Sequence, residues 1–524
     1  SLNADYVLQS GRRGATLKLG GLVPGFLRRT DAAMGLEKPF LNLVPSSFRF
    51  SSGLSRFQSD LIAYQVPVAR PADSLLRAVT ALSDLWRNST GLTWQPLGML
   101  TLGGELASTR DLRDYADSTT LGRVATDARR TFLGMDVGVE RDRQFSTNLR
   151  LTPRIVSWLR PRYVTSSGFV LSRSLTSRDP IREDGDTAGA FVLPQTLNNS
   201  RLREYGVSLD LSRLLVRVLG DSVRALRFAR RLRPFDLSDR LTRTSTFDLA
   251  AFAPSLSYHF ALGGLDQFLF QQGDSAIGAA EVKNTAFSGG ADLPLGLSFQ
   301  LSYGRVRTTR FQRVSGSFLS TETQQREWPK GSVRLTRTLR SFPISLIGVG
   351  ATFRNVRGST LVPSTTGPAV QGATHASNFA PDAQFTLSNG MVFTFSYAII
   401  GQENQANGNR TRLDQRDLTA GFNHAFQLPA AISRTRKLVR SQLSGALSKS
   451  LTCLERVGLT SCTGVSDNRR QEVRASLDTD LAQILTGGLQ FTYTLNEARH
   501  LNRKISQMAI SASFQLSLFA GDYR

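Results

Sequence analysis

Residues 489–496 read Leu-Gln-Phe-Thr-Tyr-Thr-Leu-Asn, and this stretch decides the fold. Apolar Leu489, Phe491, Tyr493 and Leu495 alternate with polar residues, a period of two that is typical of a β-strand with one apolar and one polar face. The same pattern recurs at residues 297–304, 391–400 and 510–518. Strands of this length indicate a sheet that faces lipid on one side and water on the other.

Weaker alternation continues the pattern along the chain. It occurs at residues 133–139, 205–211, 256–262 and 347–353. Polar clusters separate the strands; some are short, as at 388–390, and some are long, as at 354–382 and 402–415. We therefore predict an all-β transmembrane antiparallel β-barrel of roughly 16 to 20 strands, or part of a larger barrel. We expect residues 1–524 to form a single outer-membrane barrel.

Composition excludes a bundle of membrane helices. The mean hydropathy is −0.17 and 40% of the residues are hydrophobic, spread evenly along the chain. The longest clearly apolar run, at 342–353, is shorter than the about 20 residues that a spanning helix needs. A membrane protein with this sequence must therefore cross with strands.

The chain is strongly basic, with 64 Lys and Arg against 41 Asp and Glu and a pI near 11.0. All but seven of the basic residues are arginine. Arginine binds phosphate and carboxylate in a bidentate manner, which suits lipopolysaccharide and anionic cargo as well as nucleic acid. The arginines are dispersed through the chain and form no basic tail, so we do not expect nucleic acid as a partner.

Two segments are predicted to be amphipathic helices inserted between strands. The first is near 72–87, where apolar residues recur at helical spacing: Leu75, Leu76, Val79, Leu82 and Trp86. The second is near 212–232, where a basic stripe is formed by Arg213, Arg217, Arg224, Arg227 and Arg231. This helix either lies at the lipid headgroups, plugs the lumen, or packs on a neighbouring subunit or soluble domain. Residues 106–130 are expected to form an exposed loop helix or to be partly disordered.

The two cysteines and the last strand suit the outer membrane. Cys453 and Cys462 lie nine residues apart, in what reads as a loop, and a disulfide would fit an oxidising compartment, with two unpaired thiols as the alternative. The chain end resembles the signal by which outer-membrane barrels are recognised for insertion, through Phe514, Leu516, Leu518 and Phe519. In this chain the aromatic residue is not the last one. The resemblance implies contact with the barrel-assembly machinery.

No arrangement of residues points to catalysis. The sequence has four histidines, and no two of them have the spacing of metal ligands: His259, His375, His424 and His500. No zinc-binding or phosphate-binding motif occurs. Paired carboxylates in charged loops are explained by surface ion pairs. We expect a non-enzymatic protein without cofactor or metal.

A family resemblance rests on three segments: 132–141, 152–163 and 166–169. A strand, a Trp-Leu-Arg-Pro turn and a second strand that ends in an aromatic residue resemble the SprA family, the translocon barrel of the type 9 secretion system. The resemblance implies a secretion channel that passes folded cargo and binds plug or cap proteins. That family's chains are several times longer, so this chain is a C-terminal portion, a shortened relative, or similar in barrel style only.

These observations predict an outer-membrane channel or translocon component for protein export in a Gram-negative bacterium. Its expected partners are the lipid bilayer, lipopolysaccharide and plug or secreted cargo proteins. One alternative is an anion-preferring porin with arginines in its lumen; the candidates are Arg305, Arg307, Arg334 and Arg474. Another is a structural or adhesive surface protein whose barrel anchors long loops.

Overall fold

A computed structural model describes most of the chain. The described residues are 2–9, 16–18, 40–61, 79–132, 135–153, 158–175, 178–182, 191–219, 230–314, 316–339, 343–364, 367–406, 408–427, 438–456, 463–480 and 485–516. Within these ranges, no helix is long and apolar enough to cross a membrane.

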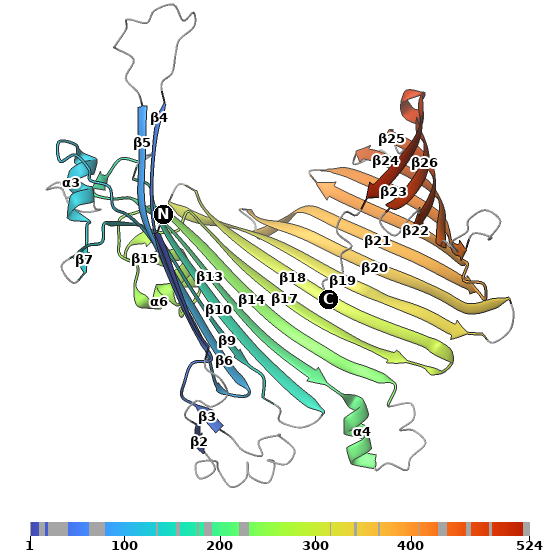
Figure 1. Ribbon diagram of the computed structural model, residues 1–524, viewed down its shortest axis with the longest axis horizontal. Helices are drawn as coiled ribbons and strands as arrows, with labels where there is room; N and C mark the ends of the chain where they lie inside the picture. Colours follow the sequence, from blue (N-terminus) through green and yellow to red (C-terminus); the bar gives the residue numbers. More distant parts are fainter. Residues whose placement is uncertain are drawn as a thin grey trace, which may run out of the picture. The chain divides into compact units, whose positions relative to one another are not determined.

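Long antiparallel strands form one sheet of 19 strands among the described residues (Figure 1). The early strands are β1 (Leu2–Gln9), β4 (Ser47–Leu61), β5 (Val79–Leu97), β6 (Leu100–Asp111), β9 (Val139–Leu151), β10 (Leu159–Arg173), β13 (Gln195–Leu209), β14 (Leu232–Ala250), β17 (Gly278–Asp292) and β18 (Leu297–Val314). The later strands are β19 (Ser317–Thr338), β20 (Ile344–Ser364), β21 (Gly367–Leu387), β22 (Val392–Ala406), β23 (Asn409–Gln427), β24 (Leu438–Arg456), β25 (Thr463–Asp480), β26 (Leu485–Ala498) and β27 (Arg503–Leu516). The predicted all-β, antiparallel fold class is confirmed.

Short elements decorate the ends of these strands. Four small hairpins are formed by β2 (Thr16–Lys18) with β3 (Phe40–Asn42), β7 (Thr131–Phe132) with β8 (Met135–Asp136), β11 (Ile181–Arg182) with β12 (Phe191–Val192), and β15 (Phe270–Gln271) with β16 (Asp274–Ser275). The helices are α3 (Thr120–Asp127), α4 (Leu211–Leu219), α6 (Leu256–His259) and α7 (Leu265–Leu269), with single 3₁₀ turns η1 (Pro294–Gly296) and η2 (Arg499–Leu501).

The chain divides into two compact units, which are described separately below. Unit 1 comprises Ser1–Ser208, Ser238–Asn284 and Thr308–Thr321. Unit 2 comprises Leu209–Leu237, Thr285–Arg307 and Glu322–Arg524. The prediction that residues 1–524 form a single barrel stays a prediction.

Two predicted long loops are strands. Residues 354–382 lie mostly within β20 and β21, and residues 402–415 lie mostly within β22 and β23. Their polarity misled the prediction, because strands of 15 to 21 residues are longer than the about 9–11 that cross a bilayer. The polar parts of these strands have polar side chains on both faces and therefore show no apolar alternation.

The helix predicted near 72–87 is wrong where the structure describes it. From Val79 onward the chain forms β5, which pairs with β4 along its first part, with Trp86 opposite Leu54. Leu82 and Trp86 are four residues apart, a spacing that places side chains on one face of a helix and also on one face of a strand. The backbone pairing of β5 with β4 and β6 stabilises the strand conformation here. Leu75 and Leu76 lie outside the described residues.

The helix predicted near 212–232 is confirmed over residues 212–219, which lie in α4. It begins after Asp210, whose carboxylate accepts hydrogen bonds from the Ser212 hydroxyl at 2.5 Å and the Arg213 amide at 3.2 Å. Arg217 lies in α4, whereas Arg224 and Arg227 lie outside the described residues. The predicted end is wrong, because Arg231 lies in a turn and β14 begins at Leu232. From Leu232 onward the backbone pairs with the sheet as β14, so a helix cannot continue through these residues.

The connection from β14 to β17 folds into α6, α7 and the β15–β16 hairpin within unit 1. Residues 256–262, predicted as weak strand, begin instead with α6, because the Ser255 hydroxyl accepts the Tyr258 amide and caps the helix. Tyr258 is 1% exposed and packs on Phe169 and Phe247, both fully buried. This apolar cluster fastens the connection to β10 and β14.

Candidate functional site

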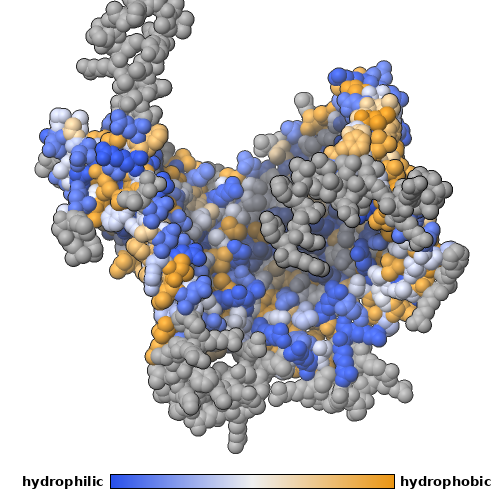
Figure 2. Space-filling model, in the orientation of Figure 1, coloured by the Kyte–Doolittle hydropathy of each residue, from blue (hydrophilic) through white to orange (hydrophobic). Residues whose placement is uncertain are grey.

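The two faces of the sheet in unit 2 differ in chemistry. One row of directly paired residues crosses eight strands, from β20 to β27, and is apolar throughout: Ile347, Phe385, Phe393, Phe422, Leu443, Ala475, Phe491 and Ile510. Nearby side chains on this face are exposed, including Phe395 (44%) and Leu489 (50%). Figure 2 shows apolar side chains gathered over β24–β26. An exposed apolar surface of this extent is rare on a monomeric soluble protein and marks a surface for contact with other apolar groups.

The neighbouring row, one residue away on each strand, consists of small or polar residues. Its members are Gly348, Gln384, Thr394, Gly421, Ser444, Arg474, Thr492 and Ala509. Successive side chains of a strand point to opposite sides, so this row lies on the face opposite the apolar row. We call this side the polar face of unit 2. Its chemistry is that of a wall in contact with water.

An ion pair spans three strands of the polar face. The register places Arg334 of β19, Gly350 of β20 and Asp382 of β21 in one row. The guanidinium of Arg334 reaches over Gly350 to the Asp382 carboxylate, with Nη2 and Oδ2 2.8 Å apart. A Cβ atom at position 350 would lie 2.7 Å from Asp382 Oδ1, so the glycine leaves the room that this pair needs.

A second charged group on the polar face lies within β25. The Glu472 carboxylate contacts Arg470 at 2.7 Å and also pairs with Arg474. These three residues are spaced by two, which places them on one face of the strand. The positive charge of the polar face is thus partly neutralised by neighbouring carboxylates.

The other two arginines predicted to face the lumen take a different position. Arg305 and Arg307 have the same strand parity as Leu301 and Tyr303, which belong to the apolar side of β18. Arg307 pairs with Glu322 at 2.6 Å and Arg305 contacts Gln324 at 3.4 Å. The structure therefore places Arg334 and Arg474 on the polar face. It places Arg305 and Arg307 on the apolar side of β18, beyond Tyr303.

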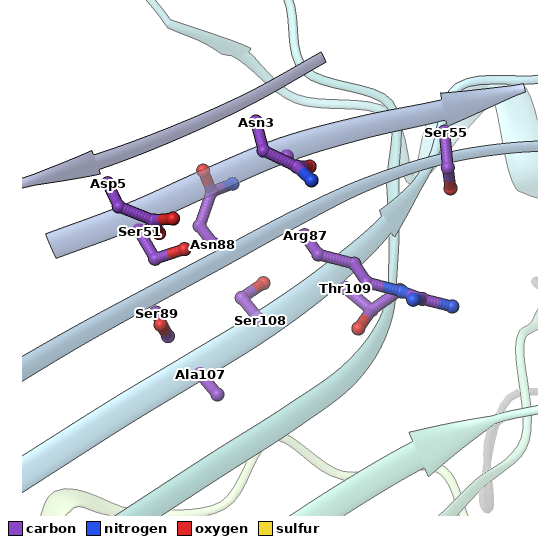
Figure 3. Close-up of a pocket in the computed structure, with 11 residues that line it drawn as sticks. Asn3, Asp5, Ser51, Ser55, Arg87, Asn88, Ser89, Ala107, Ser108 and Thr109 are labelled. Carbon is purple, nitrogen blue, oxygen red and sulfur yellow. The ribbon is translucent and has the colours of Figure 1, made fainter. Parts of the chain in front are cut away.

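Unit 1 has a polar face of its own, which carries a hollow of about 370 Å³. In Figure 3 the polar side chains that line it lie together on β1, β4, β5 and β6: Asn3, Asp5, Ser51, Ser55, Arg87, Ser89 and Thr109. Sequence reasoning missed this group, since the alternation in these strands is weak. Only the strand pairing brings the four segments together.

The remaining predicted residues are placed as follows. Cys453 lies on β24, is 3% exposed and is disulfide-bonded; Cys462 lies outside the described residues, so the pairing with it stays a prediction. The terminal strand is present as β27, with Phe514 71% exposed. Leu516 ends that strand, and Leu518 and Phe519 lie outside the described residues. No group of His, Cys, Asp or Glu able to hold a metal occurs in the described part of the chain.

Comparison with known proteins gives structural similarity only. No family model matches the chain, and no curated protein matches it. Among solved structures, the beta domain of the Bordetella autotransporter BrkA aligns at 12% identity and a TM-score of 0.19, over 46% of this chain and 92% of that one. The siderophore receptor PirA from Acinetobacter baumannii aligns at 8% identity and a TM-score of 0.24, over 91% of this chain and 77% of that one.

Proposed function

We propose that this chain is a bacterial outer-membrane β-barrel whose polar face lines a water-filled passage. The observation that carries the proposal is the pair of adjacent rows in unit 2. One is apolar across eight strands and the other is small or polar across the same strands. A water-filled barrel needs both faces in this arrangement, because its outer side contacts acyl chains and its inner side contacts water.

We further propose that the passage serves protein export, without catalysis. Barrel width grows with strand number, and barrels of 16–18 strands already enclose an aqueous channel. A sheet of 19 strands is therefore wide enough for a passage that plug or cargo proteins would fill. The resemblance of residues 132–141, 152–163 and 166–169 to the SprA family supports this finer assignment.

The charge arrangement weighs against a strongly anion-selective porin. Selectivity for anions requires arginines whose charge is available to the solute. Arg334 is paired with Asp382, Arg474 shares the Glu472 carboxylate with Arg470, and Arg305 and Arg307 lie on the other side. We therefore expect weak ion selectivity.

The test is the conductance of the detergent-purified chain in a planar bilayer, with selectivity taken from the reversal potential. We expect a weakly selective conductance larger than that of a 16-stranded porin in the same bilayer, reduced when a plug protein is bound. Arg474→Glu should shift the reversal potential in the direction of greater cation selectivity. Arg416→Glu is the matched control, since Arg416 lies opposite Ile399 on the apolar side and should leave the reversal potential unchanged.

Each other outcome has a definite meaning. A strongly anion-selective conductance would replace the export assignment with the porin assignment. A chain that stays soluble without detergent and never conducts would overturn the proposal of a membrane passage.

A further inference from the structure

A cavity of about 720 Å³ lies in unit 1 between α6 and the strands β5, β6 and β9. Apolar side chains dominate its wall: Trp86, Leu106 and Phe145 from the strands, and Leu256 and Phe260 from the α6 segment. The rings of Phe145 and Phe260 pack edge to face with centroids 4.9 Å apart. The volume falls within the range of about 300–1,000 Å³ that is usual for sites of small ligands.

The cavity opens on the apolar side of unit 1. Directly paired residues share a face, and the register places Leu106 in one row with Thr90 and Phe50. Phe50 is 38% exposed and Leu106 is 44% exposed. The polar hollow with Asp5 lies on the opposite face of the same strands, because Asp5 is one residue from Tyr6, the partner of Phe50. An acyl chain can therefore reach the cavity along apolar surface.

Positive charge is in excess at the polar end of the cavity. Arg143 pairs with Glu140, with Nη2 and Oε2 2.6 Å apart. Arg110 donates to the backbone oxygens of Val137 at 3.5 Å and Gly138 at 3.2 Å. No ion pair joins Arg110 to a carboxylate in the part of the chain that the structure describes. Two guanidinium groups and one carboxylate thus lie at this end, which leaves a positive charge for an anion to neutralise.

A polar atom without a partner lies at the same cavity. The His259 ring packs against Phe169 at an interplanar angle of 49°, with centroids 4.2 Å apart, and its Nδ1 lies 2.8 Å from the Ser255 carbonyl oxygen. Its Nε2 is buried and has no hydrogen-bond partner in the structure. Because this atom has almost no accessible surface, His259 forms part of the cavity wall and is not assigned a contact with a ligand.

We propose that this cavity binds one anionic lipid. The acyl chain lies along Trp86, Leu106, Phe145 and Phe260, and the phosphate is held by Arg110 and Arg143. Guanidinium groups suit phosphate because their planar N–H donors match its oxygens. The inference rests on the proposed function, since the membrane supplies the lipid. Phosphatidylglycerol and lipid A both present this combination of acyl chain and phosphate.

Trp86 makes the proposal testable in detergent, because its indole lines the cavity and is fixed by a hydrogen bond to the Ser52 hydroxyl at 2.9 Å. Tryptophan fluorescence is measured while brominated phosphatidylglycerol or brominated phosphatidylcholine is added to the micelles. We expect phosphatidylglycerol to quench at lower mole fraction. This component should disappear in Trp86→Phe and require about tenfold more lipid in Arg110→Gln.

The control is Arg150→Gln, which removes an exposed arginine from β9, the strand that carries Arg143, on the face opposite to Arg143. It should leave quenching unchanged. Equal quenching by the two lipids, or a preference that persists in Trp86→Phe, would overturn the proposal. If inorganic phosphate displaced the lipid as well as lysophosphatidylglycerol does, the site would bind an anion only, which would also overturn it. If Arg110→Gln does not fold, the comparison of the two brominated lipids and the Trp86→Phe variant still test the proposal.

The assay is independent of channel activity. Selective quenching by a chain that does not conduct would support the lipid site and refute the water-filled passage. Conductance without selective quenching would support the passage and refute the lipid site.

Discussion

Asp111 ends β6 and is fully buried, yet its charge is satisfied by the loop that follows. Arg113 Nη2 lies 2.6 Å from Asp111 Oδ2, and the Tyr115 hydroxyl donates to the same oxygen at 3.1 Å. Arg113 also donates through Nη1 to the Leu82 carbonyl oxygen of β5 at 2.9 Å. These contacts fasten the loop before α3 to the ends of two strands.

The first prediction concerns the removal of this buried charge. Asp111→Asn should lower the free energy of unfolding by about 3 kcal/mol, because Arg113 loses its partner in a buried site. Asp114→Asn is the control: Asp114 pairs with Arg129 at 2.6 Å, but its side chain is 94% exposed. That variant should cost less than about 1 kcal/mol. Urea unfolding in lipid vesicles measures both, and equal costs would contradict the assignment.

The second prediction is a pH dependence at Tyr115. Burial raises the pKa of the Tyr115 hydroxyl to about 12, and the nearby Asp111 charge adds to the shift while Arg113 opposes it. The folded chain therefore holds this proton between pH 10, the ordinary value, and pH 12, whereas the unfolded chain releases it. The stabilisation is complete below pH 10 and is lost as the pH rises to about 12, at no more than about 1.4 kcal/mol per pH unit.

The measurement is the urea midpoint from pH 9 to pH 12. Wild type should lose stability relative to Tyr115→Phe across this range, since phenylalanine has no proton to lose. A constant difference between the two chains would show that Tyr115 titrates normally.

At the scale of the element, the third prediction compares adjacent residues of β22. Phe395 belongs to the apolar side and Ser396 to the polar face, where its row contains Asp382 and Thr419. Phe395→Lys should destabilise the chain in vesicles by about 2–4 kcal/mol, the cost of a lysine facing the bilayer interior. Ser396→Lys should change stability by less than about 1 kcal/mol. The reverse order, in urea unfolding, would mean that the faces are assigned the wrong way round.

The sequence predicted those strands that have one apolar face and one polar face. In β22 the apolar residues Phe393, Phe395, Tyr397 and Ile399 are regularly spaced, and both the strand and its apolar face could be predicted. Beyond Ile400 the same strand continues to Ala406 with polar residues on both faces. Alternation reports the contrast between two environments, so it fails wherever both faces meet water.

The candidate site was predictable in composition but not in its contacts. The small and polar residues of the inner rows are visible in the sequence, as at Thr492 and Thr494. The ion pair of Arg334 with Asp382 joins strands through the register and the absence of a side chain at Gly350. Neither follows from spacing along the chain. The parity of Arg305 with Tyr303, in contrast, was already present in the sequence and would have assigned that arginine to the apolar side.

At the scale of the whole molecule, the chain combines a net charge of +23 with an extensive exposed apolar face. A soluble protein would bury such a face, because water contact with apolar surface is costly. The long strands place further charged residues beyond the apolar rows, as with the ion pair between Arg410 and Glu403 at 2.6 Å. Both features suit a barrel wall that crosses a membrane and projects beyond it.

The most direct test of this account is a spin-label scan along β22 and β26 in reconstituted vesicles. Single cysteines replace residues 392–399 and 488–495 in a background with Cys453→Ser and Cys462→Ser, and collision rates with oxygen and with a water-soluble nickel complex are measured. We predict oxygen maxima at Phe393, Phe395, Phe491 and Tyr493, and nickel maxima at Thr394, Ser396, Thr492 and Thr494. A lack of period-two variation, or nickel access on both faces, would contradict the assignment of one face to lipid and the other to a water-filled passage.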